Sequence, residues 1–254
     1  MSEKSEISYT DINVTTIDGW IEEGWQWGQP IFHETYIKAL SGDWEVLLTP
    51  KTAVPREWFE DIKGKRLLGL ACGGGQQMPI FAAAGAICTV LDYSEKQLES
   101  EGLVCEREGY PIEIVRADMT KPLPFEDGVF DIIFNPVSLC YVKDISFVYG
   151  ECYRVLRAGG ILMTGMDNGI CYAYDDNREV LTYPLPYDPL SDEQLYRQAL
   201  EAGDGIQFSH TPGQIVAAIA RSGFKIEDAY DDIDSEGALA EYNIPTFIAI
   251  KARK

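Results

Sequence analysis

Residues 67–75 read Leu-Leu-Gly-Leu-Ala-Cys-Gly-Gly-Gly, and this stretch decides how the rest of the chain is interpreted. The apolar run predicts a buried strand. The three glycines predict a tight turn in which a ligand can lie against the backbone, because no Cβ stands in the way. A helical pattern follows at once, and the free N–H groups at the start of such a helix attract an anionic group. Asp92 ends the next apolar run, where a carboxylate can accept hydrogen bonds from ribose hydroxyls, so the stretch predicts a site for a nucleoside-containing cofactor.

Outward from this turn, strand and helix patterns alternate toward the C-terminus. Ser-Glu-Lys-Gln at 94–97 and Thr-Pro-Gly-Gln at 211–214 have the spacing of a capping box, so each predicts the start of a helix. Ala-Gly-Gly at 158–160 predicts a turn before the next strand. This rhythm is typical of a parallel sheet. The predicted strands are residues 67–70, 86–91, 112–117, 129–134, 161–166, 224–230 and 246–252, and helices are predicted to begin near residues 76, 94, 144 and 211.

Two segments fall outside this rhythm. Residues 1–60 hold all five tryptophans and none of the predicted strands, so we expect an aromatic-rich N-terminal arm beside a main domain at 61–254. Exposed tryptophans on that arm can make a dimer surface, so we expect either a monomer or a homodimer. Residues 167–210 form a long connection rich in tyrosine and acidic residues, which is unusual unless it has a role. We expect it to be a lid-like insertion that covers the site.

The composition limits the classes of partner. With 254 residues and 46% hydrophobic content, the chain can bury one full α/β core. The net charge of −20 disfavours nucleic acid and anionic membranes as partners, because Lys and Arg hold both. Residues 1–11 lack the features of a signal peptide, and no apolar run is long enough to span a bilayer, so we expect a cytoplasmic protein. Six scattered cysteines without a Cys-x-x-Cys pair favour neither disulfides nor a metal site.

Five motifs occur in an order known from one family. They are residues 68–75, Asp92, Ala-Asp-Met at 117–119, Phe-Asp-Ile-Ile at 130–133 and Glu-Cys-Tyr-Arg-Val-Leu-Arg-Ala-Gly-Gly-Ile-Leu at 151–162. Together they resemble a class I S-adenosylmethionine-dependent methyltransferase of the methyltransferase-11-like, small-molecule type. The resemblance implies a Rossmann-like, doubly wound α/β fold with a seven-stranded, mostly parallel sheet whose last strand is antiparallel. It also implies S-adenosyl-L-methionine as cofactor and an unidentified small molecule as methyl acceptor.

The same resemblance implies roles for individual residues. The backbone of Ala71, Gly73 and Gly75 would pass beneath the methionine part of the cofactor, and Asp92 would hold the ribose. Asp118 would accept a hydrogen bond from the adenine amino group, beside the polarizable side chain of Met119. Residues 136–138 would form a floor beside the transferred methyl group. The full set of predicted cofactor contacts is Ala71, Cys72, Gly73, Gly75, Gln76, Asp92, Tyr93, Gln97, Asp118, Met119, Asn135 and Pro136.

The glycine motif departs from the family pattern at two positions. Gly69 stands where an acidic residue is usual, which removes a charge that commonly organises the amino end of the cofactor. Ala71 stands where the first glycine is usual, and it is tolerable there if its backbone has a negative φ. We hypothesise that Gln76 and Gln77 supply neutral hydrogen-bond acceptors in place of the missing acid.

Methyl transfer requires in-line alignment, and it requires a base only if the acceptor must lose a proton. His33 and His210 are the only histidines and are therefore candidates for that base, although a lone histidine is more often structural. Tyr36, Tyr141 and Tyr187 are comparable candidates. Tyr141 is the best placed of them, because it follows strand 129–134 at the edge where ligands bind in α/β sheets.

Three other functions are weighed against this one. Asn135-Pro136 resembles the start of the Asn-Pro-Pro-aromatic signature of amino-nucleobase methyltransferases, but the match ends after two residues. A nicotinamide-dependent oxidoreductase would suit the glycines and Asp92, yet the chain lacks a clear Tyr-x-x-x-Lys pair. A noncatalytic adenosylmethionine-binding module is the third alternative, because Gly69 weakens the expected cofactor site.

Overall fold

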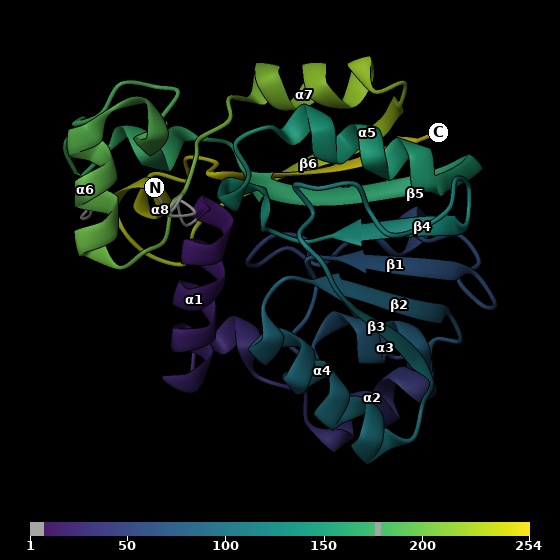
Figure 1. The fold of residues 1–254 in the computed structure, drawn as a ribbon. Coiled ribbons are helices and arrows are strands. Elements are labelled where there is room, and N and C mark those ends of the chain that lie inside the picture. The colour runs from purple at the N-terminus through teal and green to yellow at the C-terminus, as the bar shows by residue number, and fades with distance from the viewer. Residues whose placement is uncertain (1–7, 176–178) are drawn as a thin grey trace, which may run out of the picture.

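A seven-stranded sheet forms the centre of the computed structural model, which describes residues 8–175 and 179–254 (Figure 1). The strand order is β3-β2-β1-β4-β5-β7-β6, and β7 runs antiparallel to both of its neighbours. The predicted fold class is therefore confirmed. Residues 1–7, on which part of the signal-peptide prediction falls, lie outside the described residues. The strands are β1 Arg66–Leu70, β2 Ile87–Asp92, β3 Ile112–Arg116, β4 Phe130–Asn135, β5 Leu156–Asp167, β6 Lys225–Asp232 and β7 Phe247–Arg253.

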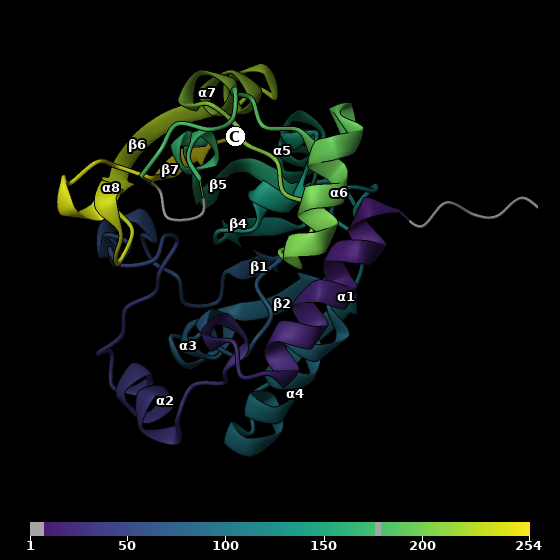
Figure 2. The same cartoon turned by 90° about the vertical axis from the view of Figure 1, so that its left-hand side faces the viewer.

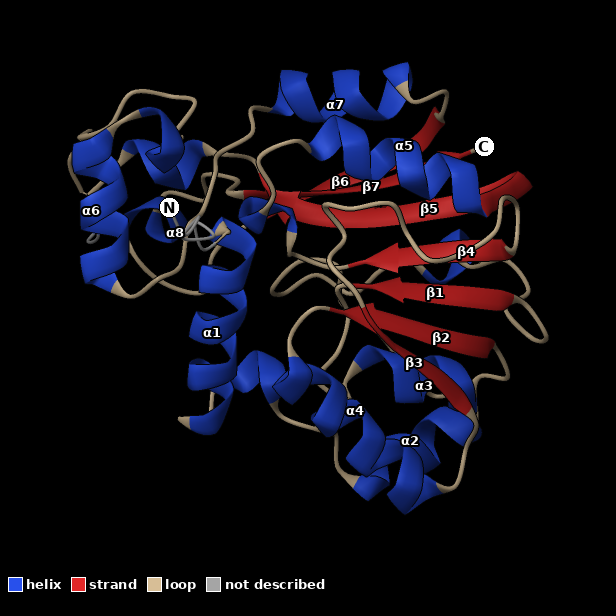
Figure 3. Cartoon of the chain, in the orientation of Figure 1, coloured by secondary structure: helices blue, strands red, loops and turns tan. Residues whose placement is uncertain are grey.

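The helices predicted at residues 94, 144 and 211 begin directly after those capping residues, and Figure 3 shows the helices in blue. The side chain of Ser94 accepts from the backbone N–H of Gln97, and Thr211 forms a complete capping box with Gln214. Each cap satisfies a helix N–H that has no partner within the helix. The helices are α1 Tyr9–Glu22, α2 His33–Leu40, α3 Gln77–Ala83, α4 Glu95–Glu108, α5 Ile145–Val155, α6 Glu193–Ala202, α7 Pro212–Arg221 and α8 Ala238–Glu241.

The sheet separates two hydrophobic cores, because successive strand residues point to opposite faces. Leu68 and Leu162 face α5 and α7 in one core. Leu67 faces α3 and the N-terminal arm in the other core, which includes Phe81 of α3 and Trp58 of the arm. Burial of each such large apolar side chain contributes roughly 1.5–3 kcal/mol to folding. The arm thus contributes side chains to one of the two main hydrophobic cores.

The turn predicted at residues 158–160 lies inside a strand. β5 already begins at Leu156, which pairs with Phe130, and the pairing then shifts so that Ile132 pairs with Ile161. The extra residues form a bulge, and Gly159 takes a positive φ of 75° within it. The glycines therefore bend the strand locally without ending its pairing.

The tryptophans of the arm do not form an exposed surface. All five are buried or partly buried, which contradicts the expectation of exposed tryptophans at a dimer surface. Trp58 is 2% exposed, and its indole N–H donates to Asp228 of β6 over 2.9 Å. The large apolar side chains that α2 exposes are instead Ile37 and Leu40.

α1 stands beside the carboxyl ends of the parallel strands, and α6 of the 167–210 insertion lies along its outer side (Figure 2). Asn13 of α1 donates to the carbonyl of Ile206 over 2.9 Å and accepts from the N–H of the same residue over 2.6 Å. The ring of Tyr9 packs edge-on against Phe208 at 5.3 Å. The insertion thus holds α1 in place. None of the helices described is long and apolar enough to cross a bilayer.

Candidate cofactor and acceptor site

The glycine turn lies directly against α4. The N–H of Gly74 donates to the carbonyl of Gln97 over 2.8 Å, and the N–H of Gly75 donates to the buried carboxyl of Glu101 over 3.1 Å. A Cβ added to Gly73 would lie 2.6 Å from the Cβ of Gln97. A side chain at Gly73 would therefore push the turn away from α4.

Ala71 adopts a positive φ of 47°, and the expectation of a negative φ is wrong. Its N–H donates to the carbonyl of Leu91 over 2.7 Å, which ties the end of β1 to the end of β2. This hydrogen bond fixes the chain direction at the turn, and a residue with a Cβ in this conformation carries a strain of about 1–2 kcal/mol.

Met78 fills the space beside Gly69, so a side chain does not fit at this position. A Cβ at Gly69 would lie 2.4 Å from the sulfur of Met78 and 3.1 Å from the Cβ of Cys72. Met78 of α3 is fully buried, so it has little room to move. An acidic side chain at position 69 is therefore excluded by packing in this chain.

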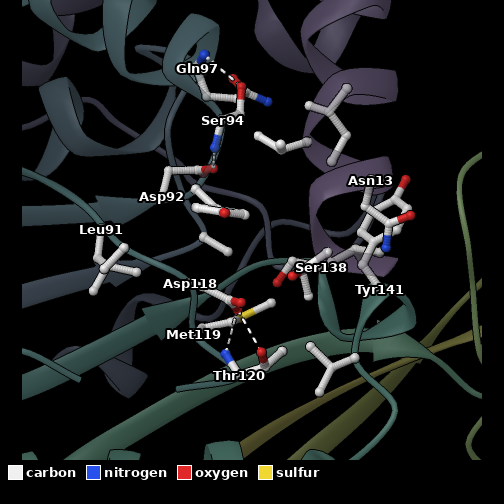
Figure 4. A pocket seen from close by; sticks show the side chains of 18 of the residues that line it. Asn13, Leu91, Asp92, Ser94, Gln97, Asp118, Met119, Thr120, Ser138 and Tyr141 are labelled. Atoms are coloured by element: carbon white, nitrogen blue, oxygen red, sulfur yellow. Dashed lines mark hydrogen bonds between the residues drawn. The ribbon is translucent and has the colours of Figure 1, made fainter. Parts of the chain in front are cut away.

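Asp92 is oriented by two backbone N–H groups. Its Oδ2 accepts from Gly73 over 3.1 Å, and its Oδ1 accepts from Ser94 over 3.0 Å. The pKa of this carboxyl is raised to about 6, chiefly by burial and to a smaller extent by nearby Asp18, while the backbone N–H groups oppose the rise. The two N–H groups aim the carboxylate at a cavity beyond the end of β2, which is shown in Figure 4.

This cavity, which we call the Asp118 cavity, encloses about 720 Å³ of empty space, part of it open to solvent. Asp118 accepts from the N–H and the hydroxyl of Thr120 over 2.8 and 2.7 Å, and Met119 lies beside it (Figure 4). The hydroxyl of Tyr93 donates to Asp11 over 2.6 Å and so ties the rim to α1. The lining residues on α1 are Thr10, Asn13, Val14 and Ile17.

A second cavity, which we call the Cys140 cavity, adjoins the first and encloses about 1050 Å³, again partly open to solvent. Its lining comes from four separate parts of the chain: residues 25–27 and 47–50 of the arm, residues 71–77 with Gln97, residues 136–141, and a C-terminal group at 234, 235 and 247. The two cavities share five lining residues and therefore form one cleft. These shared residues are Trp25, Ala71, Gln97, Val137 and Tyr141.

The side chain of Gln97 supports the presence of a ligand site in this cleft. It is 9% exposed and lines both cavities, yet its side-chain oxygen has no hydrogen-bond partner among the described residues. A buried acceptor of this kind costs roughly 1–3 kcal/mol when it stays unpaired, so a ligand that donates to it gains that amount. The glycine turn, Asp92 and Gln97 together fit a ligand that carries hydroxyl and amino groups.

The two glutamines proposed as neutral acceptors have structural partners. The amide of Gln76 donates to the carbonyls of Gln26 and Gln29 over 2.7 and 3.0 Å. The oxygen of Gln77 accepts from the N–H of Leu47 over 3.1 Å. Both residues line the Cys140 cavity, but these bonds hold the arm against α3, and the Gln77 oxygen is already in use.

Asn135 does not line either cavity, which contradicts its place among the cofactor contacts. It is 1% exposed, donates to the carbonyl of Leu70 over 2.8 Å, and accepts from the hydroxyl of Thr164 over 3.0 Å. These bonds link the ends of β1, β4 and β5. The Asn-Pro grip of amino-nucleobase methyltransferases therefore has no counterpart here, and only Pro136 of the pair reaches the cleft.

Neither histidine lies in the cleft, contrary to the expectation that one supplies a base. His33 is exposed at the start of α2, and its Nδ1 lies 2.8 Å from Glu108. His210 is 7% exposed and donates to the carbonyl of Val142 over 2.8 Å, while burial lowers its pKa. Both are structural because their hydrogen bonds join neighbouring segments.

Of the three tyrosine candidates, the structure places only Tyr141 in the cleft, where it lines both cavities. Tyr36 of the arm stacks on Tyr110 at 5.6 Å, and Tyr187 stacks on Tyr172 at 5.6 Å within the insertion. No described residue of the insertion lines either cavity. The insertion therefore acts on the cleft through α1, and its expected direct cover of the site is not seen.

The sequence did not identify the arm residues that line the cleft. Trp25 and Trp27 lie more than forty positions before the glycine turn, and no motif connects the two segments. The only available signal was the concentration of tryptophan in the arm, which predicted packing but no position.

Comparisons with known proteins agree with this geometry. A family profile described as a methyltransferase domain matches residues 68–164. The chain is 33% identical over 241 residues to the uncharacterized methyltransferase YbaJ of Bacillus subtilis strain 168, covering 92% of this chain and 94% of that one. It is 28% identical over 166 residues to sterol 24-C-methyltransferase ERG6B of Gibberella zeae, covering 64% of this chain and 40% of that one.

The comparison of folds agrees with the comparison of sequences. An S-adenosylmethionine-dependent methyltransferase from Mesorhizobium loti superposes with a TM-score of 0.62 at 23% identity, covering 78% of this chain and 95% of that one. The chain belongs to the class I S-adenosylmethionine-dependent methyltransferases. It is an enzyme of methyl transfer, and the alternative of a nicotinamide-dependent oxidoreductase finds no support in these similarities.

Proposed function

We propose that the Asp118 cavity holds the adenosyl part of S-adenosylmethionine and that the Cys140 cavity holds a small-molecule methyl acceptor. The observation that carries this proposal is the position of Asp92. Two backbone N–H groups orient its carboxylate, and it lines the cavity formed where β2 ends beside the glycine turn. The shared lining of the two cavities supports transfer between ligands bound on either side of Ala71.

Each part of the cofactor has suitable partners in the Asp118 cavity. The carboxylate of Asp92 would accept from the two ribose hydroxyls, and the second oxygen of Asp118 would accept from the adenine amino group. Met119 offers an apolar surface to the adenine ring. The unpaired oxygen of Gln97 would accept from the amino end of the cofactor, near the turn at residues 71–75.

The cofactor supplies a methyl group on a positively charged sulfur, and the protein has to align the acceptor with that group. Trp25 and Tyr141 line both cavities and Trp27 lines the Cys140 cavity, so these rings would exclude water from the junction once both ligands are bound. Alignment in a dry site lowers the barrier to an in-line displacement, because little ordering remains to be done in the transition state. Sterol and quinone methyltransferases among the relatives support a small-molecule acceptor.

Isothermal titration calorimetry with S-adenosylmethionine, S-adenosylhomocysteine and NAD tests the proposal. We expect both adenosyl-sulfur ligands to bind the wild type and NAD not to bind. The Asp92→Asn variant is expected to lose at least about tenfold in affinity, since one charged hydrogen-bond acceptor is worth about 1.5–3 kcal/mol. The matched control is Glu99→Gln on the exposed side of α4.

Equal affinity of the Asp92→Asn variant and the wild type would overturn the assignment of the ribose site. Binding without methyl transfer to any of a panel of phenols, amines and carboxylic acids would favour a noncatalytic binding module.

We also propose that the protein acts in the cytoplasm as a monomer or homodimer. All six cysteines are free thiols, which suits a reducing compartment. Light scattering of the purified protein would measure its oligomeric state.

A further inference from the structure

The lining of the Cys140 cavity is aromatic and acidic. Trp25, Trp27, Tyr141 and Phe247 contribute rings, and Asp234 contributes a carboxylate. Within the described part of the chain, no Lys, Arg or His lines it. The side chain of nearby Lys51 donates to the backbone carbonyl of Asp234. A cavity with this lining favours an organic cation over an anion, because aromatic faces attract positive charge and no cationic side chain of the described residues lines it.

A buried carboxyl group with an unused oxygen lies behind the lining of this cavity, within electrostatic reach of the lining residues Cys140 and Tyr141. Asp167 ends β5 and is 5% exposed. Its Oδ1 accepts from the N–H of Gly169 over 3.0 Å, but its Oδ2 has no hydrogen-bond partner among the described residues. Buried carboxylate oxygens are normally paired, so this oxygen lacks a donor that a ligand could supply.

The position of Asp167 in the sheet brings it to the Cys140 cavity. Its partner across the ladder is Phe247, which lines that cavity. Gly165 lies two residues earlier on the same face of β5, and a Cβ there would lie 2.1 Å from the carbonyl oxygen of Leu48, another lining residue. Asp167 therefore points to the side of the sheet on which the cavity lies.

The titratable groups that interact with Asp167 are Cys140, Tyr141 and Tyr172. Burial raises the pKa of Asp167 to about 7, and burial also raises the pKa of each of the other three. Among residues 8–175 and 179–254, no positively charged group acts on Asp167. A carboxyl group in this state can hold an ammonium group and take its proton near neutral pH.

We propose that the methyl acceptor is an amine, whose ammonium group donates to Oδ2 of Asp167 and passes its proton to that oxygen before methylation. This inference rests on the proposed function of the cleft. The freed nitrogen lone pair then forms the new N–C bond, while the S–C bond of the cofactor breaks and its electron pair stays on sulfur. The proton remains on Asp167 until solvent removes it.

Calorimetry of the protein saturated with S-adenosylhomocysteine tests the acceptor class. The probes are tyramine, benzylamine and 2-phenylethylamine, each compared with the alcohol that has a hydroxyl in place of the amino group. We expect the amines to bind at least about tenfold more tightly than the alcohols. Asp167→Asn is expected to remove this preference, whereas the control Asp43→Asn in an exposed turn keeps it. Amines that bind no more tightly than the alcohols would overturn the inference.

Binding of S-adenosylhomocysteine separates this inference from the proposed function. If that ligand fails to bind the wild type, the proposed function fails. If it binds equally to the wild type and to Asp167→Asn, the variant is folded and the amine comparison is decisive.

A second measurement tests the proton transfer. With S-adenosylmethionine and the tightest-binding amine, we expect the wild-type rate to rise as the pH increases through about 7, because Asp167 must be ionised to accept the proton. Asp167→Asn is expected to lose at least about 100-fold in rate and to lose that step in the profile. The same step in the profile of the variant, or no methylation by the wild type, would contradict the role of Asp167.

Discussion

The two cavities of the cleft are built in different ways. The Asp118 cavity takes its polar groups from the ends of β2 and β3, so short sequence motifs specify Asp92, Asp118 and the glycine turn. The Cys140 cavity gathers residues from the arm, from the segment after β4 and from the C-terminal strand region. The comparison teaches that local motifs can specify the proposed cofactor cavity, whereas the proposed acceptor cavity depends on long-range packing.

The largest expected effect comes from a change in the glycine turn. Gly73→Val places a side chain where a Cβ already lies 2.6 Å from Gln97. We expect at least about a 100-fold loss in affinity for S-adenosylhomocysteine, because the turn must shift by more than a binding site tolerates. In the control Gly102→Ala on α4, the new Cβ would meet only Ile114 at an ordinary contact distance of 3.9 Å, so normal binding is expected. Unchanged affinity of Gly73→Val would show that the turn does not shape the cofactor site.

A change on α1 tests how far the insertion supports the Asp118 cavity. Asn13→Ala leaves the buried N–H and carbonyl of Ile206 without their partner, which costs roughly 1–3 kcal/mol of stability. We expect a lower Tm and about a tenfold weaker binding of S-adenosylhomocysteine, since α1 lines the cavity. Thr15→Ala, on the exposed side of α1, is the control. A lower Tm with unchanged affinity would show that the insertion stabilises the fold but does not shape the cleft.

Gly69 tests whether this chain can carry the acidic residue that the family usually has. Gly69→Glu is expected to destabilise the fold by about 1–3 kcal/mol, because the new side chain collides with Met78. Denaturant unfolding measures this loss. Combination with Met78→Ala is expected to recover part of the stability, and no recovery would show that Met78 is not the obstacle.

The smallest expected effect is at Ala71. Ala71→Gly relieves the strain of a positive φ, and we expect a gain of up to about 1 kcal/mol in the free energy of unfolding with little change in cofactor binding. A loss of stability would show that the hydrogen bond from Ala71 to Leu91 does not hold the strained conformation.

Much of the fold follows from local sequence patterns. The strands and the capped helices depend on neighbours within a few positions, so Ser94 and Thr211 could be recognised directly. The conformation of Ala71 and the lack of space for a side chain at Gly69 depend on β2 and α3, which no local pattern reveals.

The candidate site shows the same division. Asp92 ends β2, Asp118 and Met119 follow β3, and all three line the Asp118 cavity, so their placement at strand ends could be read from the sequence. The histidines were chosen for their chemistry, but their hydrogen bonds to Glu108 and Val142 place them elsewhere. Asp167 was missed because its burial and its unpaired oxygen arise only when β5, β7 and the arm come together.

The central claim is that Asp92 holds the cofactor, and its raised pKa allows a direct test. The folded protein favours the protonated form, so between about pH 4 and 6 it binds more protons than the unfolded chain, and stability falls as the pH rises through that window. Asp92→Asn removes this cost of ionisation and should not lower the Tm at pH 8. A loss of binding by this variant would therefore not reflect unfolding.

The most direct measurement is the affinity for S-adenosylhomocysteine at pH 5 and pH 8, in the wild type and in Asp92→Asn. The ionised carboxylate accepts ribose hydroxyls more strongly than the protonated one, so wild-type affinity should be higher at pH 8 than at pH 5, with the change centred near pH 6. Asp92→Asn should bind weakly and equally at both values. The assignment of Asp92 would be contradicted if the affinity of the variant rose in the same way between pH 5 and pH 8. It would also be contradicted if the variant bound as tightly as the wild type at either pH.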